Sequence, residues 1–109
     1  MGMYPCPFEI ICYHCQQAAE KALKAVLVEE RRPIPKTHDL LRLLADFSME
    51  TTMIHRYCGE LSNYAVVTRY PYHYEQAIDE DRTKGALAAA NIILQFCKEI
   101  LLQSPGSPS

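Results

Sequence analysis

Apolar residues recur at intervals of three and four along the first third of the chain, which predicts a long amphipathic helix. The members of this repeat form one broad apolar face: Phe8, Ile11, Cys12, Cys15, Ala18, Ala19, Ala22 and Val26. A second, more polar face carries Glu9, Tyr13, Gln16, Glu20 and Lys24. Arg31 and Arg32 suit the negative end of the helix dipole, and Pro33 stops the helix. The pattern predicts a helix near residues 8–31.

Three further apolar repeats predict helices near residues 37–47, 50–68 and 76–103. We expect Thr37 to cap the first of these, because a threonine hydroxyl can accept a hydrogen bond from the free N–H groups of a first turn. Ser48 or Thr51 can cap the next helix, which Pro71 ends. The sequence therefore predicts an all-α fold, an up-down bundle of four helices forming one domain over residues 1–103. Residues 104–109, rich in serine and proline, are expected to be a disordered tail.

Composition and charge narrow the possible functions. Apolar residues make up 49% of the chain, enough for a buried core, and the net charge is −2. Nucleic-acid-binding proteins usually carry a basic excess, so any site for a nucleotide or RNA must be local or assembled between subunits. No segment reaches the ~18 uninterrupted apolar residues of a membrane span. We expect no signal peptide, because the first residues show no basic stretch followed by an apolar core. We expect a cytoplasmic protein without membrane contact.

The five cysteines are expected to be reduced and free of metal. Cys12 and Cys15 share one helix face, but His14 points away from it, and no second ligand pair with suitable spacing follows. The chain also lacks a glycine-rich phosphate loop and a Ser-His-Asp arrangement. No cofactor is therefore expected.

Three short segments in fixed order carry a resemblance to a known family. They are Gln16-Gln17-Ala18-Ala19-Glu20-Lys21-Ala22-Leu23-Lys24, Thr37-His38-Asp39-Leu40 and Tyr64-Ala65-Val66-Val67-Thr68-Arg69-Tyr70-Pro71. Together they resemble the HEPN domains, small helical domains of higher eukaryotes and prokaryotes that bind nucleotides, over roughly Tyr4 to Leu102. The resemblance implies binding of a nucleotide or RNA, or pairing with a nucleotidyltransferase, and some members are toxins of toxin–antitoxin systems.

One departure from the family bears on assembly. Members usually carry another helix before the one that begins here near Phe8, whereas only Met1 to Pro7 precede it. A missing helix would leave an apolar groove on the first or last helix, and self-association is the expected way to cover it. We therefore expect a homodimer that uses one of these helices.

Ribonucleases of the family carry an arginine followed, after four to six residues, by a histidine near the start of the last helix. The nearest pair here is Arg69 and His73, with only three residues between them and Pro71 inside the gap. A histidine could move the 2′-hydroxyl proton and an arginine could stabilise the phosphorane, but the spacing differs from the motif. Arg69 could equally form an ion pair at the helix end, and we expect it to contribute more to ligand binding than His73.

The candidate nucleotide-binding residues are Arg69, Tyr70, Lys21, Lys24, Lys36 and His38. Tyr70 could stack on a base, although tyrosines near a helix junction usually pack with the hydroxyl outward. Lys21 and Lys24 could instead be solvated and paired with Gln17 and Glu20, and His38 could be a structural residue at a helix start. Three functions stay open: a nucleotide- or RNA-binding domain, an interaction module without a ligand, and a metal-independent ribonuclease using Arg69 and His73.

Overall fold

The computed structural model describes residues 7–69 and 80–103 of the 109-residue chain, and the side chains of residues 8–62 and 80–103. This part of the chain contains four helices and no strand: α1 (Pro7–Glu29), α2 (Leu40–Leu44), α3 (Thr52–Arg69) and α4 (Glu80–Gln103). The predicted all-α fold with four helices is confirmed. The helix predicted near residues 76–103 begins at Glu80 within the described residues.

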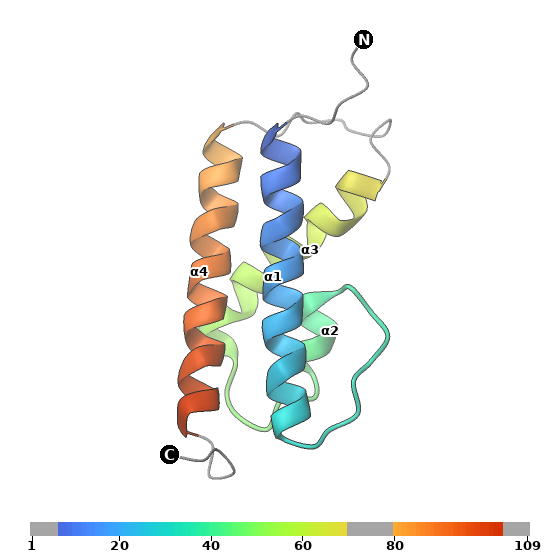
Figure 1. Cartoon of the computed structure of the whole chain (residues 1–109), viewed down its shortest axis with the longest axis vertical. Coiled ribbons are helices and arrows are strands. Elements are labelled where there is room, and N and C mark those ends of the chain that lie inside the picture. Colours follow the sequence, from blue (N-terminus) through green and yellow to red (C-terminus); the bar gives the residue numbers. More distant parts are fainter. Residues whose placement is uncertain (1–6, 70–79, 104–109) are drawn as a thin grey trace.

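Three long helices form the body of the molecule, and short α2 packs at one side (Figure 1). α1 and α4 lie side by side and run in the same direction, while α3 returns in the opposite direction (Figure 1). The pairing of α1 with α4 is the most extensive in the fold, and α3 packs against both of these helices. Among the described helices, α2 contacts α1 and α3 but not α4. α1 therefore contacts all three other helices, with α4 on one flank and α2 with its preceding segment on the other (Figure 1).

The core is continuous across all four helices and is built mainly from leucine, alanine, isoleucine and cysteine. Its fully buried large side chains include Leu23, Leu27, Leu40, Leu43, Ile54, Leu61 and Ile93. Leu23 and Leu27 widen the apolar face of α1 beyond the predicted repeat. Gln16 is 0% exposed and Glu20 is 6% exposed, so the predicted polar face of α1 is partly buried.

α1 ends two residues earlier than predicted, in a turn that satisfies its last carbonyl groups. The N–H of Arg31 donates to Val28 O and the N–H of Arg32 donates to Leu27 O, both at about 3 Å. This is the Schellman pattern, which requires a left-handed backbone at the residue after the helix. Arg31 has φ of 58° and occupies that position, where glycine is the usual residue.

α2 is shorter than predicted, with five residues, and its N-cap is Asp39 rather than Thr37. The Asp39 carboxylate accepts a hydrogen bond from the N–H of Leu41 at 3.1 Å. The Thr37 hydroxyl instead accepts from the N–H of Asp39, so it fixes the turn before the helix. From Leu44 to Phe47 the chain continues in turns whose backbone hydrogen bonds join residues three apart. The apolar pattern could not distinguish these turns from α-helix.

By length and composition alone, α4 could cross a membrane, since the mean hydropathy of its most apolar stretch is 1.5. It contributes Ala86, Ala89, Ile93 and Cys97 to the buried core against α1 and α3. Core helices of globular domains share this composition.

Candidate functional site

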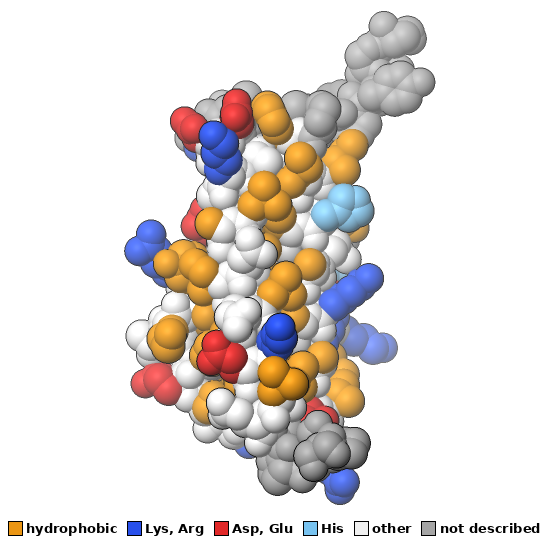
Figure 2. Space-filling model, turned by 60° about the vertical axis from the view of Figure 1, so that its left-hand side comes forward, with side chains coloured by type: hydrophobic (Ala, Val, Ile, Leu, Met, Phe, Trp, Pro, Cys, Tyr) orange, Lys and Arg blue, Asp and Glu red, His pale blue; other side chains and the backbone are white. Residues whose placement is uncertain are grey.

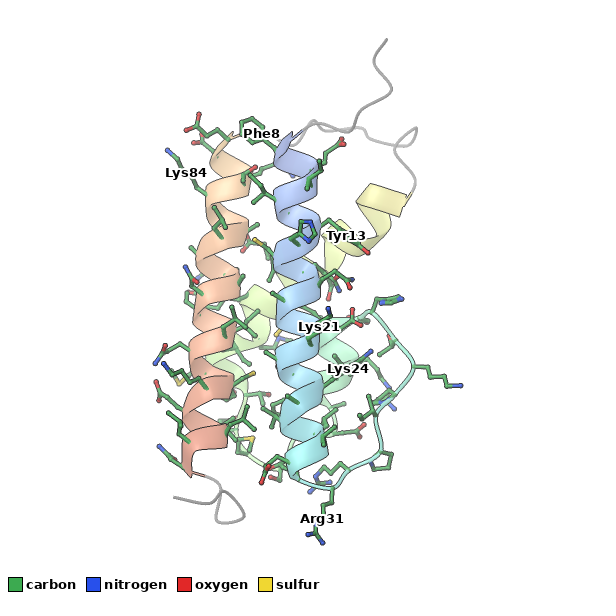
Figure 3. The ribbon with its side chains drawn as sticks, in the orientation of Figure 1. Phe8, Tyr13, Lys21, Lys24, Arg31 and Lys84 are labelled. Carbon is green, nitrogen blue, oxygen red and sulfur yellow. The ribbon has the colours of Figure 1, made fainter. Side chains whose placement is uncertain are left out.

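Four polar side chains gather where the segment between α1 and α2 crosses the middle of α1. We call residues 30–39 the linker, and Gln16, Glu20, Lys24 and His38 the polar cluster. The three α1 members are spaced by four residues, which places them along one line of the helix surface. Figure 3 shows Lys21 and Lys24 in the middle of α1, at the level where the linker returns.

Glu20 is the centre of the polar cluster. Its side chain is 8% exposed, and its carboxylate accepts from Lys24 Nζ at 2.9 Å, from His38 Nδ1 at 3.0 Å and from Gln16 Nε2 at 3.2 Å. Burial alone would raise the pKa of Glu20, but the hydrogen bonds from Lys24, His38 and Gln16 outweigh it, and the pKa lies below its usual value. Glu20 is therefore a buried, ionised carboxylate whose partners include one fixed cation.

Gln16 ties the linker to α1. Its amide nitrogen donates to the carbonyl oxygen of His38 at 2.8 Å, across 22 residues of sequence, as well as to Glu20. Its amide oxygen accepts from Gln17 Nε2 at 2.8 Å. All the hydrogen-bonding groups of this buried amide are engaged, which is the condition under which a buried polar side chain is tolerated.

The residues after His38 are fixed from the side of α3. The N–H of Leu40 donates to the Ser62 hydroxyl at 2.8 Å, and that hydroxyl lies 3.3 Å from the Asp39 carboxylate. His38 is thus held by α1 through its ring and its carbonyl group, while its C-terminal neighbours are held by α3. Its side chain nonetheless remains 54% exposed.

The candidate nucleotide-binding residues divide into two groups. Lys21, Lys36 and His38 are exposed and belong to the middle of α1 and the linker; we call them the His38 surface. Lys24 is 28% exposed and pairs with Glu20, as one alternative predicted. Gln17, the residue expected to pair with Lys21, donates its amide nitrogen to the Gln16 amide oxygen.

The second group lies largely outside the described residues. Arg69 is the last residue of α3, and its side chain is not described. Tyr70 and His73 fall wholly outside. The hypothesis that Arg69 and His73 form a catalytic pair therefore stays a prediction.

The described cysteines are buried free thiols: Cys12, Cys15, Cys58 and Cys97. Burial raises the pKa of Cys97 to about 12, and burial together with Cys97 raises that of Cys58 to about 12. Burial and the neighbouring Cys12 raise the pKa of Cys15 as well. Thiols of this kind are poor nucleophiles and poor metal ligands at neutral pH. Among the described residues no group of histidine, cysteine and acidic side chains could hold a metal ion.

The contacts of Gln16 and Glu20 were not predicted, although the sequence contains a signal for them. Continuing from Gln16 and Glu20 by helical spacing leads to Leu23 and Leu27, which are fully buried. Two leucines in line with a glutamine and a glutamate indicate a face that packs against something. The partner, His38 in the linker, could not be read from that spacing.

The helical fold defines an all-α domain, and the polar cluster gives it an ordered polar surface where the linker crosses α1. The family model described as HEPN domain matches residues 6–100. The chain therefore belongs to the HEPN domain family, as the three segments predicted, and it is a helical domain of a nucleotide- and RNA-related family. No curated protein and no solved structure matches the chain.

Proposed function

We propose that this HEPN domain binds a nucleotide or RNA at the His38 surface. The observation that carries the proposal is that an exposed histidine is held in place by a buried, ionised carboxylate and a buried amide. Ligand sites are built from side chains that neighbouring groups hold in one orientation, as Glu20 and Gln16 hold His38. Lys21, which follows Glu20 on α1, and Lys36, two residues before His38, are exposed and supply positive charge for phosphate groups.

Lys24 has a different role in this proposal. Its ammonium group is committed to Glu20 at 2.9 Å and is largely covered, so it holds the carboxylate rather than the ligand. Among the described residues, only Lys21 and Lys36 then offer free positive charge at the His38 surface. A small cationic site of this kind is compatible with a net charge of −2 for the whole chain.

The test is binding of ATP and of a mixed-sequence RNA oligonucleotide, measured by calorimetry. The double variant Lys21→Ala/Lys36→Ala should weaken binding by roughly 1–3 kcal/mol and reduce its salt dependence, because charged contacts to phosphate are lost. Arg56→Ala is the matched control, since Arg56 is an exposed cation on α3, outside the His38 surface and the exposed face of α4. Equal losses for the control and the double variant would show that the His38 surface is not the binding site.

We also propose that the protein is a homodimer that buries the exposed side of α4 and α1. Leu87, Leu94 and Leu102 of α4 are 44%, 37% and 70% exposed. Figure 2, in which the α4 side comes forward, shows hydrophobic side chains along this face with charged ones between them. Exposed leucines at this spacing along a helix are typical of an interface between helices.

Sedimentation velocity at micromolar concentration tests the dimer. Leu94→Asp should shift the protein to a monomer, because it places a charge within the proposed interface. Met53→Asp is the matched control, since Met53 is a 75% exposed apolar side chain on α3. A wild-type monomer of ~12 kDa under these conditions would exclude the proposal.

Ribonuclease activity and a nucleotidyltransferase partner remain the alternatives that the family suggests. Retained RNA binding with loss of RNA cleavage in His73→Ala would favour the ribonuclease, and would reverse the expectation that Arg69 matters more than His73.

A further inference from the structure

The contact with Glu20 decides which nitrogen of the His38 ring carries the proton. His38 Nδ1 lies 3.0 Å from Glu20 Oε1 and 3.3 Å from Oε2. An ionised carboxylate can only accept a hydrogen bond, so Nδ1 must be the donor. In the neutral ring the other nitrogen, Nε2, then carries a lone pair and no hydrogen.

The ring geometry also decides where this lone pair points. The two nitrogens of an imidazole lie on different edges of the ring and point away from each other. The Nδ1 edge faces the carboxylate of Glu20, whose side chain is 8% exposed, whereas the His38 side chain is 54% exposed. The Nε2 edge therefore belongs to the exposed part of the ring and offers a hydrogen-bond acceptor to solvent.

This acceptor is held in a fixed position. Gln16 Nε2 donates to the carbonyl oxygen of His38 at 2.8 Å, and the N–H of Leu40 donates to Ser62 at 2.8 Å. Together with the Nδ1 contact, these bonds restrain both the backbone and the ring torsions. A ligand group that meets Nε2 does so at little cost in side-chain ordering.

We propose that His38 Nε2 accepts a hydrogen bond from the 2′-hydroxyl of a ribose, so that the His38 surface selects RNA over DNA. This inference rests on the proposed function. Phosphodiester oxygens carry no hydrogen at neutral pH and suit Lys21 and Lys36, whereas the Nε2 lone pair of the neutral ring suits a hydroxyl donor. The 2′-hydroxyl is also the group that distinguishes RNA from DNA. Glu20 is a positioning residue, because it acts on the ligand only through the His38 ring.

The first experiment measures the His38 tautomer by ¹⁵N NMR of the neutral imidazole ring. We expect a protonated Nδ1 and an unprotonated Nε2 in the wild type. Glu20→Gln should shift the ring toward the Nε2–H form, because a neutral amide can donate to Nδ1 as well as accept from it. A wild-type ring protonated on Nε2 would overturn the inference whatever the ligand.

The second experiment compares one oligonucleotide sequence with four sugars: ribose, deoxyribose, 2′-fluoro and 2′-O-methyl. The wild type should bind the ribose form about three- to tenfold more tightly than the other three, the range of one neutral hydrogen bond. The 2′-fluoro and 2′-O-methyl forms keep the sugar pucker of RNA but have no hydroxyl hydrogen to donate. They therefore separate a hydrogen bond to His38 from recognition of backbone shape.

Two variants complete the design. His38→Ala should bind all four sugars equally, while Lys36→Ala should weaken all four by the same factor and keep the preference for ribose. Equal wild-type affinity for all four would overturn this inference and leave the proposed function standing. Absence of binding to any of them would overturn the proposed function, and the inference with it.

Discussion

The two flanks of α1 are built from different chemistry, although they belong to the same helix. Toward α4 it presents buried apolar side chains such as Cys12, which meets Thr83, and forms the most extensive pairing in the fold. Toward the linker it presents Gln16 and Glu20, which hold His38 through hydrogen bonds. Any apolar surface of the right shape can pack on the apolar flank. The polar flank instead requires a segment whose hydrogen-bonding groups match those of Gln16 and Glu20 in position.

The two flanks therefore contribute differently to the free energy of folding and to the placement of His38. Burying apolar surface stabilises a fold by roughly 25 cal/mol per Å², without regard to direction. Buried charged groups contribute little net stability, because desolvation offsets most of the attraction, but removing one partner is costly. We infer that the α4 flank supplies most of the stability and that the linker flank fixes the His38 surface.

The largest expected effect lies on the α4 flank. Ile93 is fully buried, and Ile93→Ala should lower the free energy of unfolding by about 2–5 kcal/mol through lost burial and a residual cavity. Its neighbour Ile92 is 36% exposed, so Ile92→Ala is the matched control and should cost about 1 kcal/mol or less. Urea unfolding followed by circular dichroism measures both, and similar losses would contradict the assignment of the core face.

A smaller loss is expected on the linker flank. Glu20→Ala removes the acceptor of Lys24, His38 and Gln16, and should cost about 2–3 kcal/mol because donors are left without a partner in a covered site. Glu29→Ala, at an exposed glutamate of the same helix, should change the unfolding free energy by about 0.5 kcal/mol or less. The Leu40 amide should also exchange its hydrogen faster in Glu20→Ala. An unchanged exchange rate would show that the polar cluster does not hold the linker in place.

The linker flank should also be the acid-sensitive one. The folded-state pKa of Glu20 lies below 4.5, its value without these partners, so its charge contributes stability that is fully present above about pH 4.5. This contribution is lost as the pH falls through the folded-state pKa. The stability difference between the wild type and Glu20→Gln should therefore shrink below about pH 4.5. A difference that stays constant from pH 7 to pH 3 would contradict an ionised Glu20.

The smallest effect concerns the turn that directs the linker back toward α1. Arg31 adopts a left-handed backbone with φ of 58°, which costs a residue with a Cβ roughly 1 kcal/mol relative to glycine. Arg31→Gly should be more stable than Arg31→Ala by about 1 kcal/mol, because both remove the charge and only one relieves the strain. Equal thermal midpoints for the two variants would show that the turn is not strained.

Helical periodicity predicted the elements of this fold well, because a face that packs on a neighbour must repeat every three or four residues. The long α1 and α4 were predicted on that basis. The N-cap of α2 was not, because Thr37 and Asp39 are both good caps, and the choice depends on the Ser62 hydroxyl of α3. Local sequence cannot supply a partner that lies 22 residues away.

The candidate site was predicted in part for the same reason. Its exposed cations and His38 could be named, since residue type and a short motif were enough. The buried Gln16 could not, because a glutamine on a polar face is ordinarily solvated. Only the crossing of the linker over α1 makes it a buried donor.

The parallel pairing of α1 with α4 has a consequence for the order in which the chain folds. Cys12 and Thr83, which meet across this pair, are 71 residues apart, whereas Gln16 and His38 are 22 apart. Closing the longer loop costs about 1 kcal/mol more in chain entropy. We expect the transition state for folding to contain α1, the linker and α2 before α4 docks, so that Leu43→Ala gives a high φ-value and Ile93→Ala a low one. The reverse order would mean that apolar docking guides the chain, and that His38 is positioned only after the body of the domain has formed.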